Sequence, residues 1–156
     1  MKRCTIFAVL AFTLASAAQA QAKAEHTTAQ DQIPLAGFQV LVPCTGDTIT
    51  FTQGYLHDMF AITTNDNHIS IKTHDQPHNL KGTDTSGRSY EGVGVTQEQF
   101  GGSLVNGSFH DTFINNFYMV GKRGAPSYKT HETSHITVTA TGRVSTAIDH
   151  LRITCG

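Results

Sequence analysis

The chain has neither a long basic run nor a long apolar one, and its 11 Lys and Arg residues nearly balance its 12 Asp and Glu residues. No run of cations is longer than two residues, as in Lys122-Arg123, so the electrostatic footprint of a nucleic-acid-binding protein is absent. An anionic membrane surface is not expected as a partner for the same reason. The longest apolar run, Thr5 to Leu14, is too short to span a bilayer. We therefore expect no nucleic-acid partner and no integral membrane segment.

The chain also lacks the motifs of nucleophilic catalysis. It contains no G-x-S-x-G, and no nucleophile stands beside a visible base. Four His–Asp neighbours occur, but adjacent residues of a strand point to opposite faces, so none forms a hydrogen-bonded pair there. The sequence therefore predicts a protein that is not an enzyme and that uses no cofactor. The four His–Asp neighbours are His57-Asp58, His74-Asp75, His110-Asp111 and Asp149-His150.

Residues 1–20 have the three parts of a secretory signal peptide. Lys2 and Arg3 supply the charged start, the apolar run follows, and Ala18-Gln19-Ala20 matches a small-residue cleavage site. We expect cleavage after Ala20 and a secreted or periplasmic location. The polar, aperiodic stretch 21–32 predicts a disordered leader, and 33–156 suits a single domain.

Cysteine is scarce, and its distribution predicts one disulfide. The chain has three cysteines, of which Cys4 leaves with the signal peptide. In an exported protein the remaining even pair, Cys44 and Cys155, is expected to be bonded. Such a bond would close a loop of roughly 110 residues.

Runs of β-formers separated by turn residues predict an all-β fold of about eight antiparallel strands. The last stretch, Ser127 to Cys155, is a predicted hairpin around Thr141-Gly142, and Asn106-Gly107 predicts another tight turn. No convincing helix follows the signal peptide. Because the strands are long and consecutive, an up-and-down β-barrel is favoured over a β-sandwich.

The string His131-Glu132-Thr133-Ser134-His135 matches the zinc-protease motif, which works on a helix. Here it lies in a strand pattern, where His131 and His135 share a face and Glu132 points to the other. His68 and His74 also occupy the polar face of their strand, so neighbouring faces could combine imidazoles around zinc or copper. No carboxylate or cysteine cluster completes a ligand set, so we expect no bound metal. His131 and His135 are the candidates if one binds.

One stripe of residues is the best candidate for a binding site. Alternate positions from Phe109 to Met119 share a face that is mostly apolar but includes two polar side chains. One interpretation is a core face; the other is the wall of a barrel pocket in which a few polar groups orient an apolar ligand. Tyr90 would suit the same wall, because Gly92 and Gly94 leave room beside it. The candidate ligand-binding residues are Tyr90, Phe109, Asp111, Phe113, Asn115 and Phe117.

Several short patterns resemble those of a group of exported bacterial β-rich proteins of unknown function. The patterns are VPC-G at Val42–Gly46, Asn115-Asn116-Phe117 with Gly121, HETSHITV at His131–Val138 and a final Asp, Ile and Cys. The resemblance implies bacterial secretion and β-structure, and it implies no activity.

The sequence thus favours a secreted, non-catalytic β-domain that binds a small apolar molecule or a partner surface. Two alternatives stay open. One is a metal-dependent enzyme or metal-binding protein using His131 and His135, and the other is a structural envelope protein. The sequence does not indicate an oligomeric state.

Overall fold

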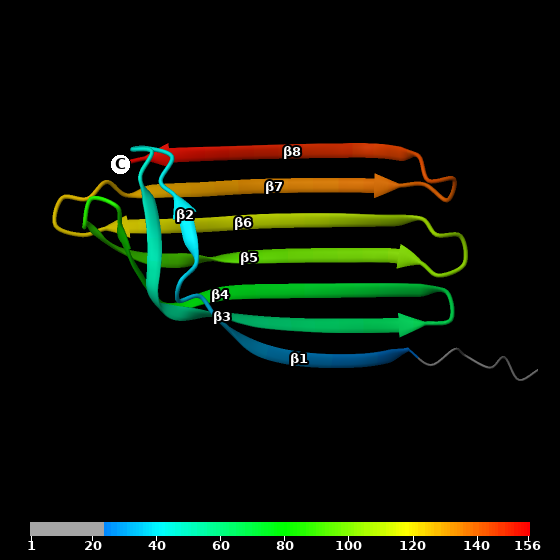
Figure 1. Cartoon of the computed structure of the whole chain (residues 1–156). Helices are drawn as coiled ribbons and strands as arrows, with labels where there is room; N and C mark the ends of the chain where they lie inside the picture. Colours follow the sequence, from blue (N-terminus) through cyan, green and yellow to red (C-terminus); the bar gives the residue numbers. More distant parts are fainter. Residues whose placement is uncertain (1–23) are drawn as a thin grey trace, which may run out of the picture.

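A computed structural model describes residues 24–156 (Figure 1). The described chain forms a single antiparallel sheet with the order β1-β3-β4-β5-β6-β7-β8, and β2 pairs with β3 beside this path. The prediction of an all-β fold with about eight strands is confirmed. The predicted signal peptide, residues 1–20, lies outside the described residues, as does the start of the predicted leader. The strands are β1 (Glu25–Pro34), β2 (Gln39–Leu41), β3 (Thr48–Asn65), β4 (His68–Asp84), β5 (Ser89–Ser103), β6 (Phe109–Gly121), β7 (Tyr128–Val138) and β8 (Val144–Cys155).

The predicted closure into a barrel is wrong. Among the described strands, β1 pairs with β3 and β8 pairs with β7, so the two edges of the sheet do not meet. Figure 1 shows β1 and β8 at opposite edges of the sheet. A barrel interior must be filled by inward side chains, whereas the corresponding face of this sheet carries a row of carboxylates, described below. The up-and-down strand order itself is as predicted.

The expectation of a disordered leader over 21–32 also needs correction, because residues 25–34 form β1. This strand pairs along its whole length with β3, from Glu25 opposite Thr64 to Pro34 opposite Tyr55. Its side chains are nearly all exposed and polar. An edge strand needs main-chain hydrogen bonds on one side only, and polar side chains are typical of such a position. The composition that suggested disorder is therefore that of an edge strand.

Within residues 24–156, the sheet is covered at one end only, by a cap that we define as residues 35–52. Strand β3 bends where its register with β4 shifts on both sides of Gln53. Gly54 at this bend has φ of 108°, and a Cβ there would lie 2.5 Å from the Leu80 Cα, so only glycine fits. Beyond the bend, the first residues of β3 and all of β2 run across the neighbouring strands (Figure 1).

The hydrophobic core lies beneath this cap. Glycines at positions 82 and 92 leave space for it, since a Cβ at Gly82 would lie 2.6 Å from the Ile49 side chain. The disulfide Cys44–Cys155 joins the cap to the end of β8, with 5.8 Å between the Cα atoms, and confirms the predicted pairing. In the part of the chain that the structure describes, no helix has the length and hydropathy of a membrane span. The buried apolar residues are Val42, Ile49, Phe51, Leu80, Tyr90, Met119, Ala125 and Tyr128.

Candidate binding surfaces

Away from the cap, no described element covers either face of the sheet (Figure 1). Directly paired residues of an antiparallel sheet lie on the same face, and faces alternate along each strand. The registers therefore assign every strand residue to the face that continues the core or to the opposite one. We define the open half as β1 together with residues 56–65, 68–77, 95–103, 109–117, 130–138 and 144–153.

Charged side chains are sorted between these two faces. With the exception of Glu91, which pairs with Lys122 at 2.7 Å, every Asp and Glu of the strands lies on the core-continuing face, here named the carboxylate face. These residues are Glu25, Asp31, Asp58, Asp75, Asp84, Glu98, Asp111, Glu132 and Asp149.

All nine histidines of the chain, and every Lys and Arg of the strands, lie on the opposite face, here named the histidine face. These residues are His26, His57, His68, His74, His78, His110, His131, His135, His150, Lys72, Lys81, Lys129 and Arg152. The sheet therefore has one acidic side and one basic side.

Three aspartates stand directly opposite one another across the carboxylate face. Asp31 of β1 pairs with Asp58 of β3, which pairs with Asp75 of β4. Burial, a hydrogen bond with Asp58 and the charges of Asp58 and Glu98 raise the pKa of Asp75 to about 6. The Asp58 Oδ1 atom is buried and has no hydrogen-bond partner among the described residues. Like charges directly opposite each other destabilise a sheet, so folding alone gives no reason for this row.

The predicted binding stripe is divided between the core and the open half. Tyr90 is only 1% exposed, and its hydroxyl donates a hydrogen bond to Asp84 Oδ2 at 3.1 Å, so it belongs to the core rather than to a pocket wall. Phe117 packs against the core cluster. The interpretation as a core face is therefore right for this end of the stripe.

The other members of the stripe lie on the carboxylate face of the open half. Phe109, Asp111 and Phe113 are half-buried there, and Asn115 accepts a hydrogen bond from the Thr96 hydroxyl at 3.2 Å. The registers place all of them on one face, as the alternation predicts. Because the sheet is open, this face is a surface and not the wall of a barrel lumen.

His131 and His135 share the histidine face, and Glu132 lies on the other face, as predicted. Each ring has its own hydrogen bond: His131 Nδ1 with Asn116 Oδ1 at 2.7 Å, and His135 Nδ1 with the Thr112 hydroxyl at 2.7 Å. Strands β5 and β6 separate them from the histidines of β4. Within residues 24–156, no group of three or more His, Cys, Asp or Glu side chains is placed to hold a metal ion.

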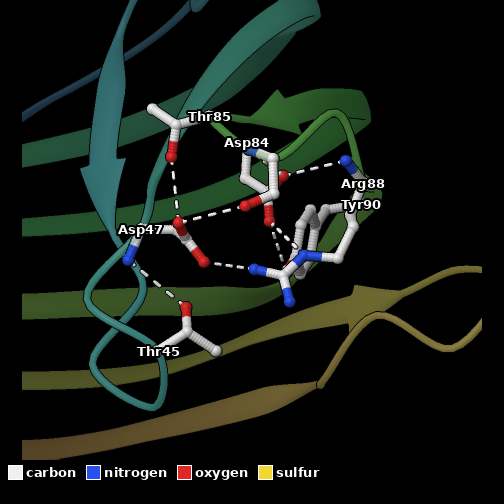
Figure 2. A network of polar contacts seen from close by, with 7 residues as sticks. Thr45, Asp47, Asp84, Thr85, Arg88 and Tyr90 are labelled. Carbon is white, nitrogen blue, oxygen red and sulfur yellow. Dashed lines mark hydrogen bonds and ion pairs between the residues drawn. The ribbon is translucent and has the colours of Figure 1, made fainter.

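A buried polar network under the cap was not predicted from the sequence (Figure 2). The Asp84 side chain is fully buried, and it accepts hydrogen bonds from Arg88 Nε at 2.7 Å and from the Tyr90 hydroxyl. Arg88 also pairs with Asp47 of the cap. Burial acts to raise the pKa of Asp84, but the bonds from the Arg88 main chain and side chain and from Tyr90 outweigh it and hold the pKa below its usual value. The network fastens the cap to the β4–β5 turn and has a structural role.

Comparison with protein-family models, with curated proteins and with solved structures found no match to this chain. The resemblance to exported bacterial proteins stays a prediction, and no relative assigns a function to either face.

Proposed function

We propose that the protein is an exported, non-catalytic binding domain whose open half docks a partner surface, and that this partner is a second copy of the chain. The observation that carries the proposal is the sorting of charge between the two faces. The carboxylate face of one copy is complementary to the histidine face of another, so the copies would stack face to face. A small apolar ligand is less well supported, because the sheet lacks the barrel lumen that would enclose it.

The dimensions of the open half suit such a contact. With a rise of about 3.3 Å per residue and about 4.8 Å between strands, each face measures roughly 30 Å by 30 Å, or about 900 Å². A standard protein–protein interface buries about 800 Å² on each partner. One face of the open half is therefore large enough for a specific interface.

Apolar side chains among the carboxylates would contribute to the contact. Half-buried aromatic and aliphatic residues alternate with the acids along the central strands, and covering them would remove apolar surface from water, which stabilises association. On the carboxylate face these residues are Phe60, Ile62, Ile71, Phe100, Phe113 and Ile136.

Contact between unlike faces has two consequences. The interface is heterologous, so each added copy leaves one face free and the assembly grows as an open stack. Histidine gains positive charge as the pH falls from 8 to 5, while most carboxylates stay ionised. We therefore expect association to strengthen toward about pH 5–6 and to weaken with added salt, which screens charge.

A charge-swap experiment tests the proposal. Glu98 and Lys72 are exposed, lie on neighbouring strands and belong to opposite faces. Glu98→Lys alone and Lys72→Glu alone should each lower the weight-average mass in sedimentation velocity at mildly acidic pH and low salt. An equimolar mixture of the two should recover it, because the reversed faces are again complementary.

The matched control is Arg143→Glu, which makes the same charge change as Lys72→Glu but lies in the β7–β8 turn. It should leave the mass unchanged, and far-UV circular dichroism should show that all variants keep their β-structure. A wild-type protein that stays monomeric up to its solubility limit across pH 5–8 would overturn the choice of a second copy as the partner. Association that the mixture fails to recover would overturn the stacking of unlike faces.

A further inference from the structure

A cationic groove lies on the histidine face, at the boundary between the capped end and the open half. Its volume is about 460 Å³. Lys129 pairs with Thr154 and His131 pairs with Arg152, so β7 and β8 project these side chains on the same side of the sheet. The residues lining it are Tyr118, Ser127, Lys129, His131, Arg152, Thr154, Cys155 and Gly156.

The positive charge of this groove is not compensated by side chains. The ion pairs within residues 24–156 involve Arg88 and Lys122, and none involves Lys129 or Arg152. Glu132 and Asp149, the carboxylates of β7 and β8, lie on the opposite face of the sheet. His131 stands directly opposite Arg152, so β7 and β8 each contribute a basic side chain to the groove.

Gly156, the last of the described residues, also lines the groove. Its oxygen accepts a hydrogen bond from the Ser127 N–H at 2.9 Å, and the Gly156 N–H donates to the Ser127 carbonyl at 3.0 Å. These two bonds hold the end of the chain against Ser127.

We propose that this groove binds a phosphate or sulfate group carried by a larger molecule. The Arg152 guanidinium offers a planar fork for two oxygens of the group, and Lys129 adds a mobile point charge. The Asn116 amide oxygen, 2.7 Å from His131 Nδ1, orients the imidazole. Tyr118 is 39% exposed at the rim of the groove, where its ring suits contact with a sugar or another flat group next to the anion.

The groove overlaps the proposed stacking surface, because His131 and Arg152 belong to the open half, so a stacked copy would compete with the anion for them. Sulfate binding does not require a second copy, so either proposal can fail alone. The groove residues on β7 and β8 are exposed, so substituting them removes no core packing. Lys129 in particular lies outside the open half and serves to separate the two proposals.

The test is a titration of the protein with sodium sulfate, followed by backbone amide chemical shifts at constant ionic strength set with chloride. We expect saturable shifts in residues 127–131 and 152–154. Each of Lys129→Gln and Arg152→Gln should weaken binding by about tenfold, the effect of removing one charge-assisted hydrogen bond.

Arg143→Gln is the matched control, since it removes one cation from the β7–β8 turn, outside both the groove and the open half, and should leave sulfate affinity unchanged. Shifts that fail to saturate, or that Arg143→Gln reduces as much as Arg152→Gln does, would overturn the proposal.

Two further titrations identify the source of the anion. Glucose 6-phosphate should bind more tightly than inorganic phosphate if the group is carried by a sugar, and Tyr118→Ala should remove that gain. Vesicles of an anionic phospholipid should bind in preference to both if the group belongs to a lipid headgroup. Failure of sulfate, phosphate and both of these probes to bind would exclude an anion site here.

Discussion

The disulfide should carry a large part of the stability of this fold. Cys44 and Cys155 are separated by 111 residues. Closing a loop of this length in the unfolded chain corresponds to about 4.7 kcal/mol on the chain-entropy model. We therefore expect the double variant Cys44→Ser, Cys155→Ser to lose about 4–5 kcal/mol of unfolding free energy, a large fraction of the 5–15 kcal/mol typical of a domain.

The loss should also be uneven along the chain. Every residue of β8 is exposed, and among the described strands it pairs with β7 alone, so the bond to the cap is its main tertiary restraint. Amide hydrogen exchange in β8 should accelerate more than exchange in the central strand β5, which serves as the internal reference.

Urea denaturation followed by circular dichroism gives the global value, and reduced wild-type protein is the control for the serine substitutions. The two should agree, because both leave the same open chain. A loss below about 1 kcal/mol, or exchange that rises equally in β5 and β8, would refute the assignment of the bond as the restraint on this edge.

Two other predictions concern the carboxylates. Asp84→Asn should lower the unfolding free energy by about 2–4 kcal/mol, because it leaves Arg88 without its buried carboxylate partner. Tyr90→Phe should lower it by only about 1 kcal/mol, because it removes a single hydrogen bond. Equal losses for the two variants in urea denaturation would contradict the central place of Asp84 in the network. The pKa of Asp75 is raised to about 6 in the folded protein, above its unfolded value near 4. Between about pH 4 and pH 6 the folded state therefore binds more protons than the unfolded state, so the unfolding free energy falls as the pH rises through this range. Asp75→Asn should remove about 1 kcal/mol of this loss of unfolding free energy with rising pH. That figure is smaller than the full pKa shift implies, because the site is partly solvated. The measurement is the melting temperature at pH 4.5 and at pH 7.5, and the two values should lie closer together in the variant than in the wild type.

The strands were predictable from the sequence where their signals are local. Asn106-Gly107 and Thr141-Gly142 mark turns that the neighbouring strands must follow, and the bend near Gly54 interrupts an otherwise continuous β pattern. Strand β1 was missed because an exposed edge strand lacks apolar alternation and is held by main-chain bonds to β3. Barrel closure depends on the twist and curvature of the whole sheet, which no local pattern encodes.

The sorting of charge was partly visible in the sequence. The neighbours His74-Asp75 and His110-Asp111 each place a histidine and an acid on opposite faces of their strand. What the sequence could not supply is the register that joins the acidic sides of different strands into one face. That register depends on turn lengths and on irregularities such as the shift between Asp75 and Leu80. The pairing of Asp47 with Arg88 was hidden for a similar reason, since the fold of the cap brings them together.

The sorted charge also bears on how copies of the chain would meet. Stability alone favours mixing the signs on each face, because opposite charges across neighbouring strands stabilise a sheet and like charges destabilise it. The row Asp31, Asp58 and Asp75 goes against this rule on three neighbouring strands, so a complementary surface outside the chain is the simplest reason for it. Among the described strands, β1 and β8 each leave one edge of the sheet unpaired, and β8 exposes Ile148 and Leu151. Pairing of such edges depends on main-chain bonds and would be indifferent to Glu98→Lys or Lys72→Glu. If the mixture of these variants recovers association, the copies contact each other through their faces. If neither substitution affects association, the copies contact each other through their edges.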